Sequence, residues 1–108
     1  MKVLCVATDA EALTALRLAT TAAEWELTPG ATNETDALGV VDAERPQAVV
    51  AFGPYEGLVD LVRERFPSTR IVTDRHAPGA SAVAASHDEV RTLLRALAGP
   101  SGPVVGAG

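Results

Sequence analysis

Short apolar runs alternate with longer stretches of helical periodicity along most of the chain, and this alternation constrains the fold more than any other feature. Runs this short are unsuited to helices but suit strands that are covered on both faces. The predicted strands cover residues 3–7, 25–27, 48–52, 71–73 and 82–85. The predicted helices cover residues 9–23, 34–44, 58–66 and 88–97. Strands and helices in this order predict a doubly wound α/β domain with a parallel sheet and right-handed crossovers.

One crossover breaks the pattern. Only seven residues separate Asp74 from Ala82, and Pro78 and Gly79 lie among them, so no full helix fits between the fourth and fifth strands. The fourth crossover helix is therefore predicted to be missing or very short. We expect this gap to leave apolar surface of the fourth and fifth strands open to a partner.

Polar residues mark the predicted helix starts. The stretch from Thr8 to Glu11 fits a capping box in which the Thr8 hydroxyl caps the first helix. Asn33 suits the start of the second helix, and the stretch from Ser86 to Glu89 fits a second capping box before the last one.

Composition excludes several classes of function. The net charge is −5, the isoelectric point is near 4.9, and Lys2 is the only lysine, so no basic stripe is available for nucleic acid. No apolar stretch approaches the length of a membrane span, and no signal peptide is evident. The single cysteine, Cys5, lies in the first apolar run, which favours a buried thiol and a reducing compartment. We therefore expect a cytoplasmic protein without direct nucleic-acid or membrane binding. No glycine-rich phosphate-binding motif is present, and no cofactor is predicted.

Three stretches carry a resemblance to a known family: "MKVLCVATDAEA", "RPQAVVAFGPYEGLVDLVRERFPSTRIVTD" and "GASAVAASHDEVRTLLRAL". Together they resemble the receiver domain of two-component response regulators over residues 1–98. The resemblance implies a flavodoxin-like fold with five parallel strands in the order 2-1-3-4-5. It also implies a role in bacterial signal transduction.

The family's chemical residues are mostly absent from the matching positions. Those positions, which form a degenerate receiver site, are Thr8, Asp9, Phe52, Gly53, Thr73 and Ser86. Where the family has an acidic cluster, this chain keeps only Asp9, and Phe52 or Gly53 stands in place of the aspartate that accepts the phosphoryl group. Since phosphoryl transfer needs both a carboxylate nucleophile and a metal site, the resemblance implies a pseudo-receiver that is not phosphorylated. The switch hydroxyl matches Thr73, and Ser86 takes the place of the lysine.

The ends of the strands allow a second interpretation. Asp9, Asp74, His76 and His87 all lie near predicted strand ends, where open α/β sheets bind ligands, and they could form a small-ligand or metal site. The alternative is that Asp9 is a helix-start carboxylate and the other three are solvated turn or first-turn residues. No paired nucleophile and base can be named, so we predict that the chain is not an enzyme.

The leading functional hypothesis is a regulatory or scaffolding module that binds a protein partner or a second copy of itself. The predicted surface surrounds the fifth strand and the last helix and includes Val83, Arg91 and Arg95. Arg91 and Arg95 are four residues apart and repel each other unless acids face them, and a second copy of this acidic chain offers such acids. A homodimer is therefore expected.

The Gly/Pro-rich segment 99–108 has two interpretations. One is a flexible tail or linker, which is the usual state of such a terminus. In the other, Val104 and Val105 begin the first strand of a further domain, because pseudo-receiver domains precede the ATPase domain in pilus-assembly and septum-site proteins related to the MinD family.

Overall fold

The computed structural model describes residues 1–98, and the predicted tail 99–108 lies outside the described residues. Five parallel strands form one sheet in the order β2-β1-β3-β4-β5, which confirms the predicted fold class. The strands are β1 (Lys2–Val6), β2 (Glu26–Leu27), β3 (Ala48–Ala51), β4 (Arg70–Thr73) and β5 (Ala82–Val83). The helices are α1 (Ala10–Thr20), α2 (Glu34–Glu44), α3 (Glu56–Arg65) and α4 (His87–Ala98).

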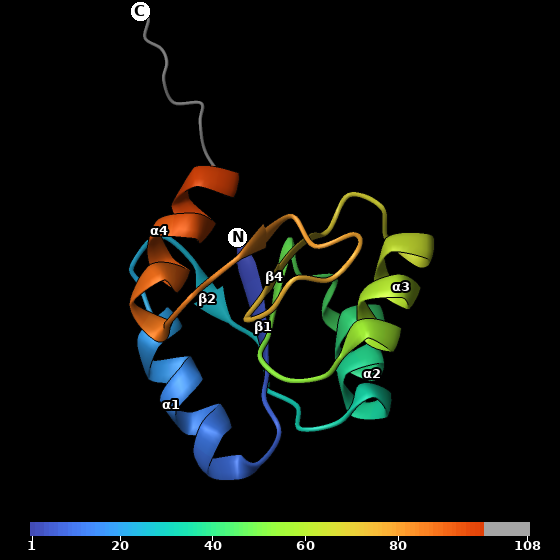
Figure 1. Ribbon diagram of the computed structural model, residues 1–108, viewed down its shortest axis with the longest axis horizontal. Helices are drawn as coiled ribbons and strands as arrows, with labels where there is room; N and C mark the ends of the chain where they lie inside the picture. The colour runs from blue at the N-terminus through green and yellow to red at the C-terminus, as the bar shows by residue number, and fades with distance from the viewer. Residues whose placement is uncertain (99–108) are drawn as a thin grey trace, which may run out of the picture.

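The sheet is covered by two helices on each face. Figure 1 shows α1 and α4 on one side of the strands and α2 and α3 on the other. Side chains of β1 and β3 alternate between the two resulting cores: Leu4 and Val49 face α2 and α3, whereas Cys5 and Val50 face α1 and α4. This burial on both faces explains why these strands are continuous apolar runs. None of the helices within residues 1–98 is long and apolar enough to cross a lipid bilayer.

The N-cap of the first helix lies one residue later than predicted. Asp9, not Thr8, is the N-cap, and its Oδ1 accepts a hydrogen bond of 2.8 Å from the Ala12 N–H. The helix ends at Thr20 instead of continuing to residue 23 because the Trp25 indole N–H donates to the Thr20 carbonyl at 2.8 Å. Asn33 caps α2 as predicted, since its side chain accepts from the Asp36 N–H.

The connection between β4 and β5 contains no helix, as predicted from its length. The connection extends toward α3 (Figure 1), where Gly79, at φ +96°, packs against the Arg63 side chain. Ile71 on β4 is only 1% exposed, so the expectation of an open apolar face was wrong for β4. Ile71 belongs to the core cluster formed with α2 and α3, so these helices bury this face of β4 although the connection is short. On β5, Val83 remains 43% exposed.

The fifth strand is shorter than predicted. The Ala84 N–H still donates to Thr73 O at 2.8 Å, and the following amide, that of Ala85, donates to Glu89 Oε1 of α4 at 3.0 Å. The backbone thus leaves the sheet to enter α4. In the second capping box, the Glu89 carboxylate was expected to accept from the Ser86 N–H. It accepts instead from the amide one residue earlier, that of Ala85.

Candidate functional site

The candidate site lies at the carboxyl ends of β1, β3 and β4. Pairing of Val6 with Ala51 and of Ala51 with Thr73 places the residues that follow these strands along one edge of the sheet. Contacts across this edge are close, because a Cβ added at Gly53 would lie 2.8 Å from the Thr8 methyl group. The structure therefore brings together the matching positions from three strands.

Asp9 is exposed at this edge and is committed to helix capping. Its carboxylate accepts from the first turn of α1, where the positive end of the helix dipole stabilises a negative charge. This arrangement agrees with the interpretation of Asp9 as a helix-start carboxylate.

Phe52 and Gly53 follow β3, at the position that matches the phosphoryl acceptor. The Phe52 ring is half-buried and packs against His87, with ring centroids 5.2 Å apart and the planes inclined by 38°. Gly53 is buried at φ +137°, a backbone conformation that side chains disfavour, and its N–H donates to Asp74 Oδ1 at 3.1 Å. An aromatic ring and a hydrogen atom thus stand where a carboxylate would be needed.

Asp74, directly after β4, is the second carboxylate at this edge. Its two oxygens accept from the Arg75 guanidinium at 3.1 and 3.3 Å, and Oδ1 also accepts from the Gly53 N–H. Partial burial alone would raise the pKa of Asp74, but these hydrogen bonds outweigh it and lower the pKa below its usual value. Asp74 therefore acts as an ionised tie between the ends of β3 and β4.

Tyr55 completes the site, and sequence reasoning missed it. Its hydroxyl donates to the Ala7 carbonyl at 2.9 Å and also lies 3.1 Å from the Thr32 carbonyl. Its ring packs against Gly53, and burial raises the pKa of the Tyr55 phenol, with a further contribution from Glu34. The only sequence signal was a lone aromatic residue directly after the Gly53-Pro54 turn.

The two hydroxyl groups at the matching positions differ, and the space beside Thr73 is filled. Thr73 is 3% exposed, and its Oγ1 donates to the Arg75 carbonyl at 2.6 Å, whereas Ser86 is exposed just before α4. The indentation between Tyr55, Thr73 and Arg75 is too small to admit a water molecule. The edge is filled by the protein's own side chains.

The proposed metal cluster does not form among the described residues. Within residues 1–98, no three metal-binding side chains come together, so Asp9, Asp74, His76 and His87 do not converge as that interpretation required. Three of these side chains are held by other contacts. Asp9 caps α1, Asp74 pairs with Arg75, and His87 packs on Phe52.

Cys5 is fully buried in β1, as predicted. Burial raises the pKa of its thiol to about 11, so the thiol stays protonated at neutral pH. Cys5 is a core residue.

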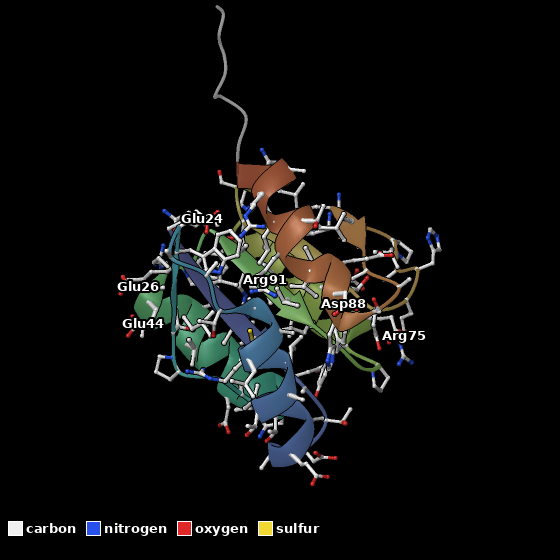
Figure 2. All side chains as sticks on the ribbon, turned by 90° about the vertical axis from the view of Figure 1, so that its left-hand side faces the viewer. Glu24, Glu26, Glu44, Arg75, Asp88 and Arg91 are labelled. Carbon is white, nitrogen blue, oxygen red and sulfur yellow. The ribbon has the colours of Figure 1, made fainter. Side chains whose placement is uncertain are left out.

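The proposed interaction surface has internal partners for its charges. Arg95 Nε donates to Glu24 Oε2 at 2.6 Å, and the guanidinium lies 5.8 Å from the centre of the Trp25 ring. Arg91 lies between α4 and the end of α1 (Figure 2) and donates to the Thr21 carbonyl at 3.3 Å. The acid that faces Arg95 thus comes from the same chain, so a second copy or another protein is not needed to supply it.

No family model matches the sequence, and no curated protein sequence matches it. Solved structures, in contrast, align over most of the chain. The signal receiver domain of an HD domain-containing protein from Pseudomonas fluorescens Pf-5 has a TM-score of 0.72 at 17% identity, covering 89% of this chain and 92% of that one. The response regulator domain of Thermotoga maritima CheB has a TM-score of 0.71 at 14% identity, covering 90% and 92%.

The chemotaxis response regulator CheY4 of Vibrio cholerae gives a third alignment, with a TM-score of 0.71 at 18% identity, covering 89% of this chain and 97% of that one. The chain has a receiver-like fold. At such low identities the likeness concerns the fold alone, and the chemistry has to be argued from the residues at the edge of this sheet. On that receiver-like fold, Phe52 and Gly53 occupy the end of the central strand.

Proposed function

We propose that this chain is a pseudo-receiver: a regulatory module with a receiver-like fold that accepts no phosphoryl group and acts by binding a protein. The observation that carries the proposal is the filled end of β3, where Phe52 packs on His87 and Gly53 donates to Asp74. Neither residue offers a nucleophilic oxygen to a phosphodonor.

The remaining carboxylates support the same conclusion. Phosphoryl transfer with magnesium needs acidic ligands whose oxygens are free to bind the ion. Asp9 is the N-cap of α1, and Asp74 is neutralised by Arg75. Asp74 would have to give up its bonds to Arg75 before it could serve a metal ion, and Asp9 alone supplies one carboxylate where the ion needs several oxygen ligands.

The site is also held in one arrangement. Tyr55 links the end of β1 to the segment before α2, and Asp74 links the ends of β3 and β4. A signalling domain with a fixed site is regulated through its partner or its amount and not through a chemical switch within its own sheet. Because no paired nucleophile and base can be named at this edge, we propose that the chain is not an enzyme, and that residues 1–98 form the functional domain.

For the partner, we propose another protein or a second copy of the chain, with the surface that includes Val83, Arg91 and Arg95 as the contact. Val83 is one of the exposed large apolar side chains among the described residues, and it lies beside α4. Sedimentation of wild type and of Arg91→Glu/Arg95→Glu tests the homodimer. We expect a wild-type dimer that the charge reversal dissociates, and a wild-type monomer at micromolar concentrations would remove the self-association. A cytoplasmic location stays a prediction from the sequence.

The test of the phosphorylation claim uses acetyl phosphate with Mg²⁺ and intact-protein mass, with a phosphorylatable receiver domain treated in parallel. We expect no added phosphoryl group on the wild type. The variant Phe52→Asp supplies a carboxylate after β3, and we expect it to stay unmodified because the metal ligands are still missing. Phosphorylation of the wild type would refute the proposal, and phosphorylation of Phe52→Asp would show that the edge still binds the metal ion.

A further inference from the structure

Two grooves lie at the opposite, amino-terminal edge of the sheet, away from the candidate site. One has a volume of about 330 Å³ and the other about 350 Å³, and they adjoin because both are lined by Gln47 and Ser68. We call them together the amino-edge groove. Its other lining residues are Met1, Ala48, Arg70, Leu94 and Leu97 in the first half, and Arg45, Pro46, Arg65, Phe66, Pro67 and Thr69 in the second.

The two halves differ in chemistry. In the first half, Leu94 and Leu97 from α4 present apolar surface beside Arg70. In the second half, the lining residues include Arg45, Arg65 and Phe66. Figure 1 shows that the start of β1 and the last turn of α4 lie at this end of the molecule.

The amino-edge groove is basic although the chain as a whole is acidic. Its described lining residues include three arginines and no aspartate or glutamate, whereas the net charge of the chain is −5. In the described part of the chain, neither Arg65 nor Arg70 forms an ion pair. These two guanidinium groups therefore have donors free for a ligand.

The acids next to the groove do not neutralise it. Glu44 is paired with Lys2 Nζ at 3.0 Å. Asp42 lies 3.8 Å from the Arg45 guanidinium, with both side chains mostly exposed, and such a pair is weak. The carboxyl-terminal ends of α2 and α3 also face this edge, but each carries only about half a unit of negative charge. Full positive charges at Arg65 and Arg70 exceed this effect.

Packing orients Arg45, one of the two arginines in the second half. The Arg45 guanidinium lies 4.9 Å from the centre of the Phe66 ring, and Arg45 Nε donates to the Asp42 carbonyl at 3.0 Å. A stacked guanidinium loses less freedom when it binds a carboxylate. In the shared middle of the groove, the Gln47 carboxamide is oriented because its Oε1 accepts from the Lys2 N–H at 2.8 Å.

From this combination we propose that the amino-edge groove binds an extended acidic segment of a partner protein, with apolar residues against Leu94 and Leu97 and carboxylates against Arg65 and Arg70. Resting on the proposed function, the inference gives the class of partner. A free phosphate ion would use the arginines but leave the apolar half empty. A segment with adjacent apolar and acidic residues matches both halves, and the acidic remainder of the chain repels it from other surfaces.

The test uses a short acetylated and amidated peptide, Leu-Leu-Gly-Glu-Glu-Glu, together with the same residues in reverse order. Binding is followed by amide chemical shifts of the ¹⁵N-labelled protein. We expect at least one peptide order to shift the amides of the groove, which are those of residues 45, 47–48, 65–66, 68–70 and 94–97. Replacing Glu by Gln or Leu by Ser in the peptide should weaken binding, as should added salt.

Matched protein variants locate the charges. We expect Arg65→Gln/Arg70→Gln to bind the peptide about tenfold more weakly, or worse, because charge-assisted hydrogen bonds to both side chains are lost. Arg63→Gln removes one charge from an exposed residue outside the groove and should bind as the wild type does, whereas Arg65→Gln and Arg70→Gln should each weaken binding. Circular dichroism of all variants checks the fold.

Three results would overturn the inference. These are shifts at another surface or none at all, a Gln peptide that binds as well as the Glu peptide, and weakening by Arg63→Gln equal to that by Arg65→Gln or Arg70→Gln. Inorganic phosphate that produces the same shifts and displaces the peptide would identify a phosphate site instead. All of these outcomes are independent of the phosphodonor experiment, so the groove can fail while the pseudo-receiver assignment stands.

Discussion

Tyr55→Phe removes one oxygen atom from the candidate site and keeps the aromatic ring. The Tyr55 hydroxyl is the partner of the Ala7 carbonyl, and Ala7 is 1% exposed. In the variant, this carbonyl and that of Thr32 lose their donor while the ring still covers them. Leaving a buried acceptor unsatisfied costs about 1–3 kcal/mol, so we expect the free energy of unfolding to fall by about 1–2 kcal/mol.

The assay is urea denaturation followed by the fluorescence of Trp25, the only tryptophan. A matched control is Thr14→Val, which removes an exposed hydroxyl bonded to the Ala10 carbonyl within α1. The control should change the free energy of unfolding by less than about 0.5 kcal/mol. If Tyr55→Phe changes the free energy of unfolding as little as the control does, the hydroxyl does not stabilise the site.

Tyr55 is also the only tyrosine, so its ionisation can be followed by absorbance. Its pKa is raised in the folded protein, and the neutral phenol therefore stabilises the fold fully below the ordinary tyrosine pKa of 10.0. As the pH rises above that value, the unfolded state releases the proton first and this stabilisation is lost. The difference in the free energy of unfolding between wild type and Tyr55→Phe should shrink in that range. A difference that grows with pH would contradict a raised pKa of the Tyr55 phenol.

Three further predictions concern single residues. Asp9→Ala should lower the free energy of unfolding by about 1 kcal/mol because the Ala12 N–H loses its cap. Asp9→Ser should retain most of the wild-type free energy of unfolding, and equal losses in the two variants would argue against capping. Cys5 should react with a thiol reagent only after unfolding, since the thiol is buried with a pKa of about 11, and rapid labelling of the native protein would contradict this. Asp74→Asn should be less stable than wild type at neutral pH. Because the pKa of Asp74 is lowered in the folded protein, this difference in the free energy of unfolding should vanish as the pH falls below the usual carboxyl pKa of 3.8. A difference that persists at low pH would exclude charge pairing with Arg75.

Apolar runs and helical periodicity in the sequence were enough to predict the strands, the helices and the α/β class, whereas the strand order came from the resemblance to receiver domains. The continuous runs at β1 and β3 indicated strands buried on both faces, and Asn33 indicated the start of α2. These signals are local, because each depends on residues that lie within a few positions of one another. The missing helix before β5 was equally visible as a short connection.

The candidate site was predictable only in part, because its decisive contacts join distant parts of the chain. Phe52 and Gly53 showed in the sequence that an acceptor carboxylate was absent. The bond from Tyr55 to Ala7 spans 48 positions, and the bond from Arg95 to Glu24 spans 71. No periodicity or short motif records such pairs, since they are created by the order of the strands and the crossing of the helices.

The central claim is that the end of β3 does not bind a phosphoryl group, and the most direct measurement uses a phosphoryl analogue. Beryllium fluoride with Mg²⁺ is added to the ¹⁵N-labelled protein, and the amide signals of Thr8, Phe52, Gly53 and Thr73 are compared before and after. The pseudo-receiver assignment predicts that these signals stay in place at all concentrations of the analogue. A saturable shift of the Phe52 and Gly53 amides that depends on Mg²⁺ would contradict it.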